Sequence, residues 1–137
     1  MKLSFDASPD DLQIFLQEAD EQIALLDEAV LRLERDATSD LLQAIFRAAH
    51  TLKGSSASIG HTRMADLTHA LEGVLDKLRK GSVVVSPPLI DALLAGLDAL
   101  RLLREEVVTA EAADLDLEPV LAQLHAVAAV EVPATAA

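Results

Sequence analysis

The apolar residues of this chain recur at intervals of three and four positions along extended segments, which short polar or proline-containing breaks separate. Such spacing places the apolar side chains on one face of an α-helix, and that face must be buried against another element. The first segment begins with Ser8 as a helix N-cap and Pro9 at the first helical position, and it runs to about Arg35. The pattern restricts the chain to a packed arrangement of amphipathic helices.

Four more segments with the same spacing follow. Their predicted limits are Thr38 or Ser39 to about Gly60, about Thr62 to Gly81, Pro87 or Pro88 to about Val107, and a shorter helix, capped by Asp116 with Pro119 in its first turn, to about Val130. Helices joined by short breaks predict an all-α fold, an antiparallel four-helix bundle with an additional C-terminal fifth helix. We expect residues 1–130 to form this one domain, and the Ala/Pro-rich residues 131–137 to be a flexible tail or linker.

Composition excludes several classes of partner. Hydrophobic residues make up 51% of the chain but aromatic residues only 2%, so the helices are built mainly from Leu, Ala and Val. The 23 acidic residues outnumber the 11 basic ones, and the net charge of −12 argues against binding to nucleic acid or to an anionic membrane. Without cysteine there is no disulfide or thiolate site, and no stretch reads as a signal peptide or a membrane span. We expect a cytoplasmic, monomeric domain.

The most unusual stretch is AAHTLKGSSASIG, residues 48–60, in which His50 is followed by Lys53 and then by small residues. On a helical wheel with Leu52 at zero, Ile45 and Ile59 fall within about 20° of it and His50 lies about 160° away. Gly54 lies beside His50, and Lys53 lies at its flank. The stretch therefore predicts a helix that buries one face and displays a histidine on the other, among small side chains.

The next helix supplies a carboxylate in the pattern H-x-x-E, formed by His69 and Glu72. With Leu71 at zero on the wheel, Glu72 lies at about 100°, the edge of the buried stripe, and His69 at about 160°. A carboxylate that accepts from one imidazole N–H fixes the tautomer and makes the other nitrogen a better nucleophile. An ammonium such as that of Lys53 offsets the charge of an incoming phosphoryl group. These residue types suit a histidine that accepts a phosphoryl group.

The segment FRAAHTLKGSSASIG, residues 46–60, resembles the signature of histidine phosphotransfer (HPt) domains. Together with HALEGVLDKLRKG, residues 69–81, it is most similar to the N-terminal phosphotransfer domain of the CheA family of chemotaxis histidine kinases. The matching motifs span residues 45–81, and the helix layout extends the resemblance to about residue 130. The resemblance implies roles for five residues: phosphorylation of His50, a hydrogen bond from His50 to Glu72, phosphoryl or partner support by Lys53, a polar network that includes His69, and close approach of a partner at Gly54.

The same resemblance implies two partners and no bound cofactor. The ATP-binding domain of a histidine kinase, using ATP with Mg, would phosphorylate His50, and an aspartate in the receiver domain of a response regulator would then take the phosphoryl group. The chain has no Gly-rich nucleotide motif, so it would be the phosphoacceptor domain of a histidine protein kinase rather than the catalyst. The alternative within the family is a stand-alone phosphorelay intermediate, or an HPt domain of a non-chemotactic CheA-like kinase.

Two alternatives lie outside the family. His50, His69 and Glu72 are a candidate set of three metal ligands, but bundle di-iron sites use paired Glu-x-x-His motifs, and this chain has one motif in the reverse order. A purely structural or docking bundle is the other alternative. The remaining histidines, His61 and His125, are interpreted as structural or solvent-facing.

Overall fold

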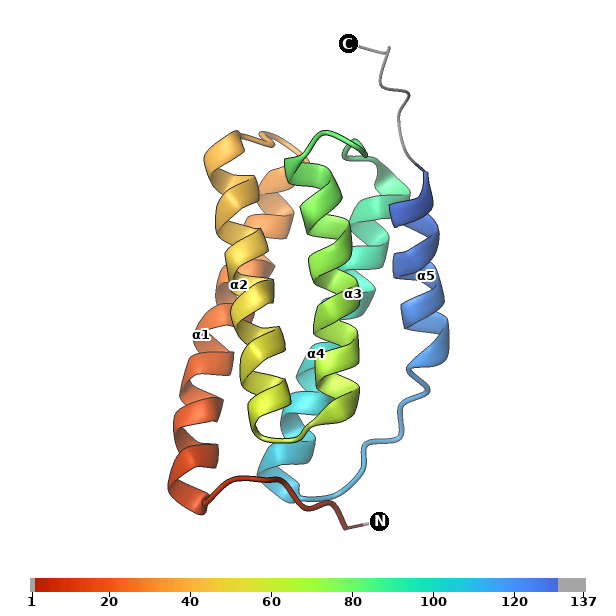
Figure 1. Ribbon diagram of the computed structural model, residues 1–137. Coiled ribbons are helices and arrows are strands. Elements are labelled where there is room, and N and C mark those ends of the chain that lie inside the picture. Colours follow the sequence, from red (N-terminus) through yellow and green to blue (C-terminus); the bar gives the residue numbers. More distant parts are fainter. Residues whose placement is uncertain (1, 131–137) are drawn as a thin grey trace.

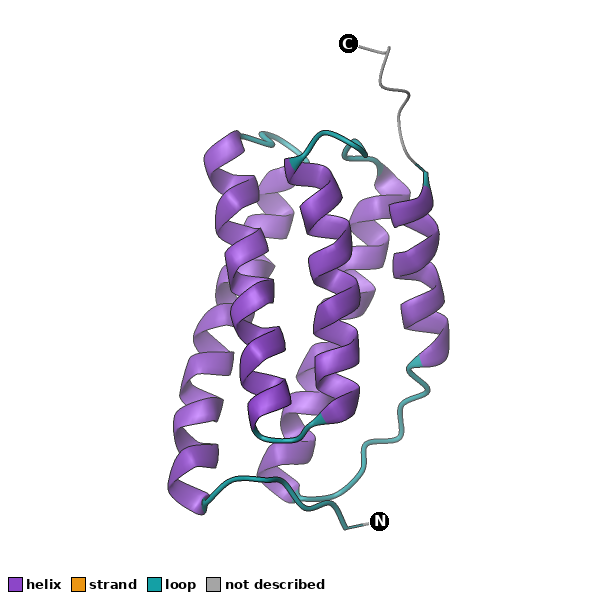
Figure 2. Ribbon diagram, in the orientation of Figure 1, coloured by secondary structure: helices purple, strands orange, loops and turns teal. Residues whose placement is uncertain are grey.

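The computed structural model describes residues 2–130 and contains five α-helices in this range (Figure 1). They are α1 (Pro9–Leu33), α2 (Ser39–Ser58), α3 (Thr62–Arg79), α4 (Pro87–Thr109) and α5 (Glu118–Ala129). Loops join them (Figure 2), and the β-pairing found among the described residues is one isolated bridge between Lys2 and Glu111. The predicted all-α class is confirmed. The predicted tail, residues 131–137, lies outside the described residues.

The first four helices form the predicted antiparallel bundle, and α5 packs against it as an addition. α1 contacts α2 and α4, while α3 contacts the same two helices, so that the four enclose one core. α5 lies against α3 and α4, on the side of the bundle away from α1 (Figure 1). The largest fully buried side chains are Leu26, Leu33, Ile45, Leu52, Met64, Leu67, Leu75, Leu89, Leu93, Leu97, Leu100 and Leu103. No helix among residues 2–130 has the length and apolar character that crossing a bilayer requires.

Side-chain caps begin α1 and α2 at the predicted residues, and α4 begins at the predicted Pro87 with a cap that was not predicted. Ser8 Oγ accepts a hydrogen bond from the N–H of Asp11 at 3.1 Å, and Thr38 Oγ1 accepts from the N–H of Leu41 at 3.2 Å. Ser86 caps α4, directly before Pro87. These hydroxyls satisfy backbone donors that have no partner within the helix. Sequence and local structure agree closely at these helix starts.

The start of α5 differs from the prediction. Its N-cap residue is Leu117 rather than Asp116, and the apolar side chain of Leu117 makes no capping hydrogen bond. Leu117 is buried at 8% exposure, so its place in the core determines where the helix begins. Asp116 contributes from one position further out, because its Oδ1 accepts from the N–H of Glu118 at 3.2 Å.

A tight turn of three residues, Ile59 to His61, connects α2 to α3 and holds them antiparallel. Gly60 has a φ of +76°, a left-handed conformation that favours glycine at the end of a helix. The N–H of His61 donates to the carbonyl of Ser56 at 2.9 Å, which closes the turn onto α2. From the N-terminal segment, the N–H of Asp6 donates to the carbonyl of Ile59 at 2.7 Å. The turn is therefore anchored on both sides.

His61 is a structural histidine, 4% exposed, at the N-cap of α3. Its Nδ1 accepts from the N–H of Met64 at 3.2 Å, so the ring proton is on Nε2, which donates to the carbonyl of Leu103 at 3.1 Å. Phe5 stacks on the ring with centroids 5.1 Å apart. Burial lowers the pKa of His61 and outweighs the opposing effects of the Leu103 carbonyl and the nearby Glu106 carboxylate.

Glu106 is a buried carboxylate that the sequence did not suggest, with 1% exposure on α4. Its Oε2 accepts from Arg63 Nη1 and from the N–H of Ala113, each at 2.7 Å. Its Oε1 lies 3.2 Å from His61 Nε2 but receives no hydrogen bond, since that N–H is directed at the Leu103 carbonyl. This network ties the beginning of α3 to the end of α4 and to the loop that leads to α5.

Candidate functional site

The antiparallel packing of α2 and α3 brings His50 and Glu72 into contact. His50 Nδ1 lies 2.6 Å from Glu72 Oε2, and Lys53 Nζ donates to Glu72 Oε1 at 2.8 Å. An ionised carboxylate only accepts hydrogen bonds, so Nδ1 is the donor and Nε2 of the neutral ring keeps its lone pair. The His50 side chain is 63% exposed and that of Glu72 is 14% exposed. The arrangement therefore presents a nucleophilic nitrogen to solvent above a shielded carboxylate.

Glu72 stays ionised because its two partners outweigh its desolvation. Partial burial by itself raises the pKa of this carboxyl group, whereas the hydrogen bonds from Lys53 and His50 and the positive charge of Lys53 lower it. The net result is a pKa of Glu72 below its ordinary value. The carboxylate is thus kept in the ionised form, which accepts a hydrogen bond from the Nδ1–H of His50.

Lys53 contacts Glu72 rather than open solvent. Its side chain is 29% exposed, and its ammonium is held at one oxygen of the carboxylate whose other oxygen receives the imidazole N–H. The predicted role, support of a phosphoryl group or of a partner, requires the ammonium to be near Nε2 of His50. The geometry of the unphosphorylated protein shows a different contact, and the role in phosphoryl transfer stays a prediction.

The small residues after Lys53 do not all face outward. Gly54 is exposed, and a Cβ added there meets nothing within 4 Å, so no packing within the protein requires a glycine at this position. Ser56, in contrast, is fully buried and donates to the carbonyl of Leu52 at 2.6 Å. Ser55 donates to Glu18 Oε1 on α1 at 2.7 Å. Only part of the stretch therefore serves an open surface.

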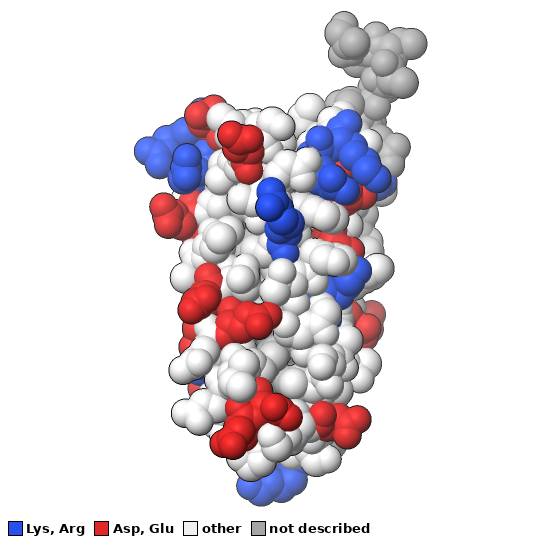
Figure 3. Space-filling model, turned by 60° about the vertical axis from the view of Figure 1, so that its left-hand side comes forward, with Lys and Arg blue, Asp and Glu red and all other residues white. Residues whose placement is uncertain are grey.

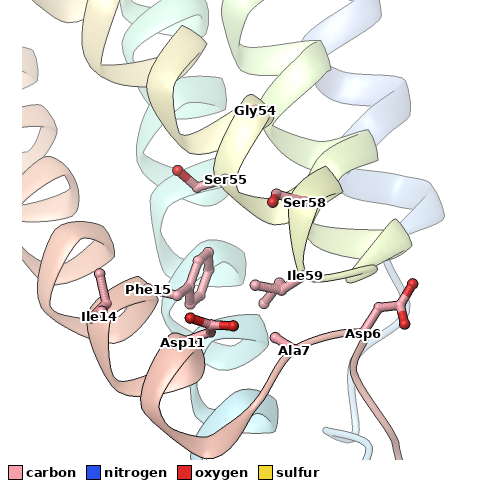
Figure 4. Close-up of a pocket in the computed structure, with 9 residues that line it drawn as sticks. All are labelled: Asp6, Ala7, Asp11, Ile14, Phe15, Gly54, Ser55, Ser58 and Ile59. Carbon is pink, nitrogen blue, oxygen red and sulfur yellow. The ribbon is translucent and has the colours of Figure 1, made fainter.

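An open hollow of about 470 Å³ adjoins this surface, between the beginning of α1 and the end of α2 (Figure 4). Gly54, Ser55 and Ser58 lie on its α2 side, and Asp11, Ile14 and Phe15 lie on its α1 side. Ile14 is 61% exposed there, an apolar side chain without cover among the described residues. The space next to Gly54 thus extends the accessible face of the site toward α1.

His69 lies apart from the contacts among His50, Lys53 and Glu72, and its predicted part in a polar network stays a prediction. It is exposed, and within residues 2–130 its side chain makes no hydrogen bond or ion pair. The physical reason is its position on α3, about 60° further from the buried stripe than Glu72, which takes it out of the groove between α2 and α3. His125 on α5 is likewise exposed. In the described part of the chain, no three His, Asp or Glu side chains are arranged to hold a metal ion.

Phe46, which the sequence did not single out, lies next to His50, and Arg79 lies against Phe46. Phe46, one turn earlier on α2, stacks with the imidazole at a centroid distance of 6.1 Å and an interplanar angle of 19°. The guanidinium of Arg79 on α3 lies over the Phe46 ring, 4.0 Å from its centroid. The i, i+4 spacing of Phe46 and His50 was the available signal, since such residues are neighbours on a helix.

Three basic side chains of the α2–α3 face are each paired with a carboxylate, in a chain whose net charge is −12. Lys53 is paired with Glu72, and both Arg79 and Lys80 are paired with Asp76, one turn further along α3. On the face seen in Figure 3, Lys and Arg atoms gather mainly toward the upper end of the bundle, whereas Asp and Glu atoms are spread along its length.

A helical bundle with an exposed histidine, whose Nδ1 is bound to a carboxylate of the adjacent helix, has the site that a phosphoryl-accepting imidazole of a phosphotransfer domain needs. The family model described as the Hpt domain matches residues 11–103, more than half of the chain. The chain belongs to the Hpt domain family, and the predicted resemblance is confirmed.

The similarity is to phosphotransfer domains of CheA. The structure of the CheA phosphotransferase domain from Thermotoga maritima is 34% identical with a TM-score of 0.69, and the match covers 74% of this chain and 99% of that one. The chemotaxis protein CheA of Bacillus subtilis is 40% identical over 114 residues, which are 82% of this chain and 17% of that protein. The chain spans less than a fifth of the length of the curated relatives it matches.

A third comparison supports the fold. The phosphorylated P1 domain of CheA3, solved in complex with CheY6 from R. sphaeroides, has a TM-score of 0.77 at 22% identity, covering 88% of this chain and 96% of that one. At this identity the likeness is one of architecture.

Proposed function

We propose that His50 accepts a phosphoryl group from the ATP-binding domain of a histidine kinase and passes it to an aspartate of a response regulator in a chemotaxis-type pathway. The observation that carries this proposal is that the two nitrogens of one imidazole have different surroundings. Nδ1 is bound to Glu72, while the side chain is 63% exposed and Nε2 has its lone pair available. The same exposed face serves both partners in turn.

The chemistry assigns one step to each partner. In the first, the Nε2 lone pair forms a bond to the γ-phosphorus of ATP, and the bond from that phosphorus to the β-phosphate oxygen breaks, releasing ADP. The positive charge that develops on the ring is stabilised through Nδ1–H by the Glu72 carboxylate. In the second, an aspartate oxygen of the receiver domain bonds to phosphorus while the N–P electron pair returns to Nε2. ATP and Mg are supplied at the kinase domain, and a cytoplasmic location is part of the same proposal.

The comparisons support the assignment to chemotaxis signalling. The curated relatives are chemotaxis proteins named CheA, and the P1 domain of CheA3 was solved in its phosphorylated form together with CheY6. The chain spans less than a fifth of the length of these relatives, so a kinase to which this domain belongs is inferred from the similarity alone. We infer that this domain is the phosphoacceptor part of such a kinase.

The test is the incorporation of acid-labile, alkali-stable phosphate. The full chain and its His50→Gln variant are incubated with [γ-³²P]ATP and the Bacillus subtilis CheA from which the phosphotransfer domain has been removed. The same two proteins are treated with phosphoramidate, a small donor that needs no docking surface. We expect label on the wild type and none on His50→Gln, while a His125→Gln control keeps the label. Acid-labile phosphate that persists in His50→Gln contradicts the proposal. A wild type that takes up phosphate from neither donor favours a structural or docking bundle.

A further inference from the structure

The hydrogen bond to Glu72 does not by itself define how the His50 ring is oriented. It places Nδ1 at 2.6 Å from one carboxylate oxygen, but the ring is 63% exposed and can still tilt about that single contact. Phosphoryl transfer requires Nε2 to approach the phosphorus in line with the leaving oxygen, and misplacement by about 1 Å can cost a hundredfold in rate. A second contact to the ring would therefore matter for the reaction.

Phe46 provides that second contact, one turn before His50 on α2. The centroid distance of 6.1 Å and the interplanar angle of 19° describe an offset stack, an arrangement that aromatic pairs prefer. Glu72 holds one nitrogen of the imidazole, and Phe46 lies against the ring as a whole. The two contacts come from different helices and restrict different motions of the same ring.

Phe46 is itself held in place from α3. Arg79 lies over its ring, with the guanidinium carbon 4.0 Å from the centroid, within the range of a cation–π contact. Asp76 fixes Arg79, because its Oδ1 accepts from Arg79 Nε at 2.8 Å and lies 2.7 Å from Nη2. A continuous series of contacts therefore links α3 to the imidazole: Asp76 pairs with Arg79, Arg79 covers Phe46, and Phe46 stacks on His50.

We propose that Phe46, supported by Arg79, is a positioning residue for phosphoryl transfer, which holds the His50 ring in the orientation that presents Nε2. This inference rests on the proposed function of His50. In this role Phe46 acts through the imidazole that it stacks against. The property that matters for the reaction is the aromatic face of Phe46, which the planar guanidinium of Arg79 on α3 covers.

The variants are chosen so that the bundle remains folded. Phe46 is half-buried and packs against the core, so Phe46→Ala would leave a gap, whereas Phe46→Leu keeps an apolar side chain and removes the aromatic face. Phe46→Tyr keeps the face and is the rescue variant. Arg79→Lys keeps a cation beside Asp76 and removes the planar group. Phe5→Leu is the matched control, because Phe5 stacks on a different histidine, His61.

Two measurements on the full chain test the role of Phe46. The first is the rate of phosphorylation by phosphoramidate, followed by ³¹P NMR. We expect Phe46→Leu to be about three- to tenfold slower and Arg79→Lys about two- to fivefold slower, with Phe46→Tyr and Phe5→Leu at the wild-type rate. The second is the NMR order parameter of the His50 Cδ2–H bond, which reports ring motion and which we expect to fall in Phe46→Leu alone among the three Phe variants.

The outcomes separate this inference from the proposed function. If the wild type is phosphorylated and Phe46→Leu matches it in rate and ring order, Phe46 has no positioning role. Equal slowing by Phe46→Leu and Phe46→Tyr also overturns the inference, since an aromatic face is present in only one of them. If phosphoramidate and the kinase both fail to label His50 of the wild type, the proposed function is the part that fails.

Discussion

Replacement of Gly54 by alanine should stabilise the protein. Gly54 lies in the interior of α2, four residues after His50, on an exposed face where an added Cβ meets nothing within 4 Å. Glycine in a helix interior is less favourable than alanine by about 0.8–1.0 kcal/mol, and no steric cost opposes that gain here. We expect the free energy of unfolding to rise by about 1 kcal/mol, and Tm to rise by about 4 °C for a domain of this size.

Urea unfolding followed by circular dichroism measures this change, with an unchanged slope against denaturant as the sign that only stability has altered. Gly73→Ala is the matched control, because Gly73 is an exposed interior position of α3 whose added Cβ also meets nothing within 4 Å. The two variants should gain similar stability. If Gly73→Ala gains and Gly54→Ala loses, the surface at Gly54 is not open as described.

A larger side chain at the same position tests why the glycine is there. Since nothing inside the protein requires it, Gly54→Leu should keep the wild-type rate of phosphorylation by phosphoramidate, which needs no docking. Transfer from His50 to a receiver domain that accepts phosphate from the wild type should slow by about tenfold or more, because the partner is displaced from in-line geometry. An unaffected transfer rate would show that partners approach His50 without covering Gly54.

Three further outcomes follow from the structure. Glu72→Ala should keep the helical circular dichroism spectrum and slow phosphorylation of His50 about ten- to a hundredfold, and a wild-type rate would exclude the hydrogen bond as a factor. Arg63→Met should lower the free energy of unfolding in urea by about 2–3 kcal/mol, less than the loss of a fully buried pair because Arg63 is 37% exposed, whereas exposed Arg32→Met should change it little. Burial lowers the pKa of His61, so as pH falls through 6.5 the unfolded state binds a proton at this residue before the folded state does. Thermal stability should therefore decline below that pH. His61→Gln should reduce this decline, and His125→Gln should not.

The helices were predictable because each carries its own apolar stripe, and α1, α2 and α4 also carry a local start signal. Ser8, Thr38 and Ser86 act within one turn of chain, and such local interactions can be found from the sequence. The exact start of α5 was not predictable in this way, because Leu117 is placed by its burial against other helices. Tertiary packing overrode the local preference for Asp116 at the cap.

The central pair of the site was accessible from wheel positions, while the surrounding contacts were not. His50 and Glu72 lie on adjacent helices joined by a short turn, so an edge position on α3 was enough to suggest their contact. The contact between Arg63 and Glu106 joins residues 43 positions apart and depends on how α4 passes the start of α3. A periodic pattern reports which face of a helix is buried but not which charged residue is buried with it.

The turn at Ile59 to His61 also limits how this stretch of chain can vary in length. His50 and Glu72 are 22 positions apart, and both must keep their places on helices that meet at an anchored three-residue turn. Because an α-helix turns about 100° per residue, adding a few residues to one helix alone rotates one member of the pair away from the other. Only the addition or removal of a full turn on both helices, about seven residues in all, preserves the contact. The connection between α1 and α2 carries no such constraint, so we expect length variation among related domains there rather than between the histidine and its carboxylate.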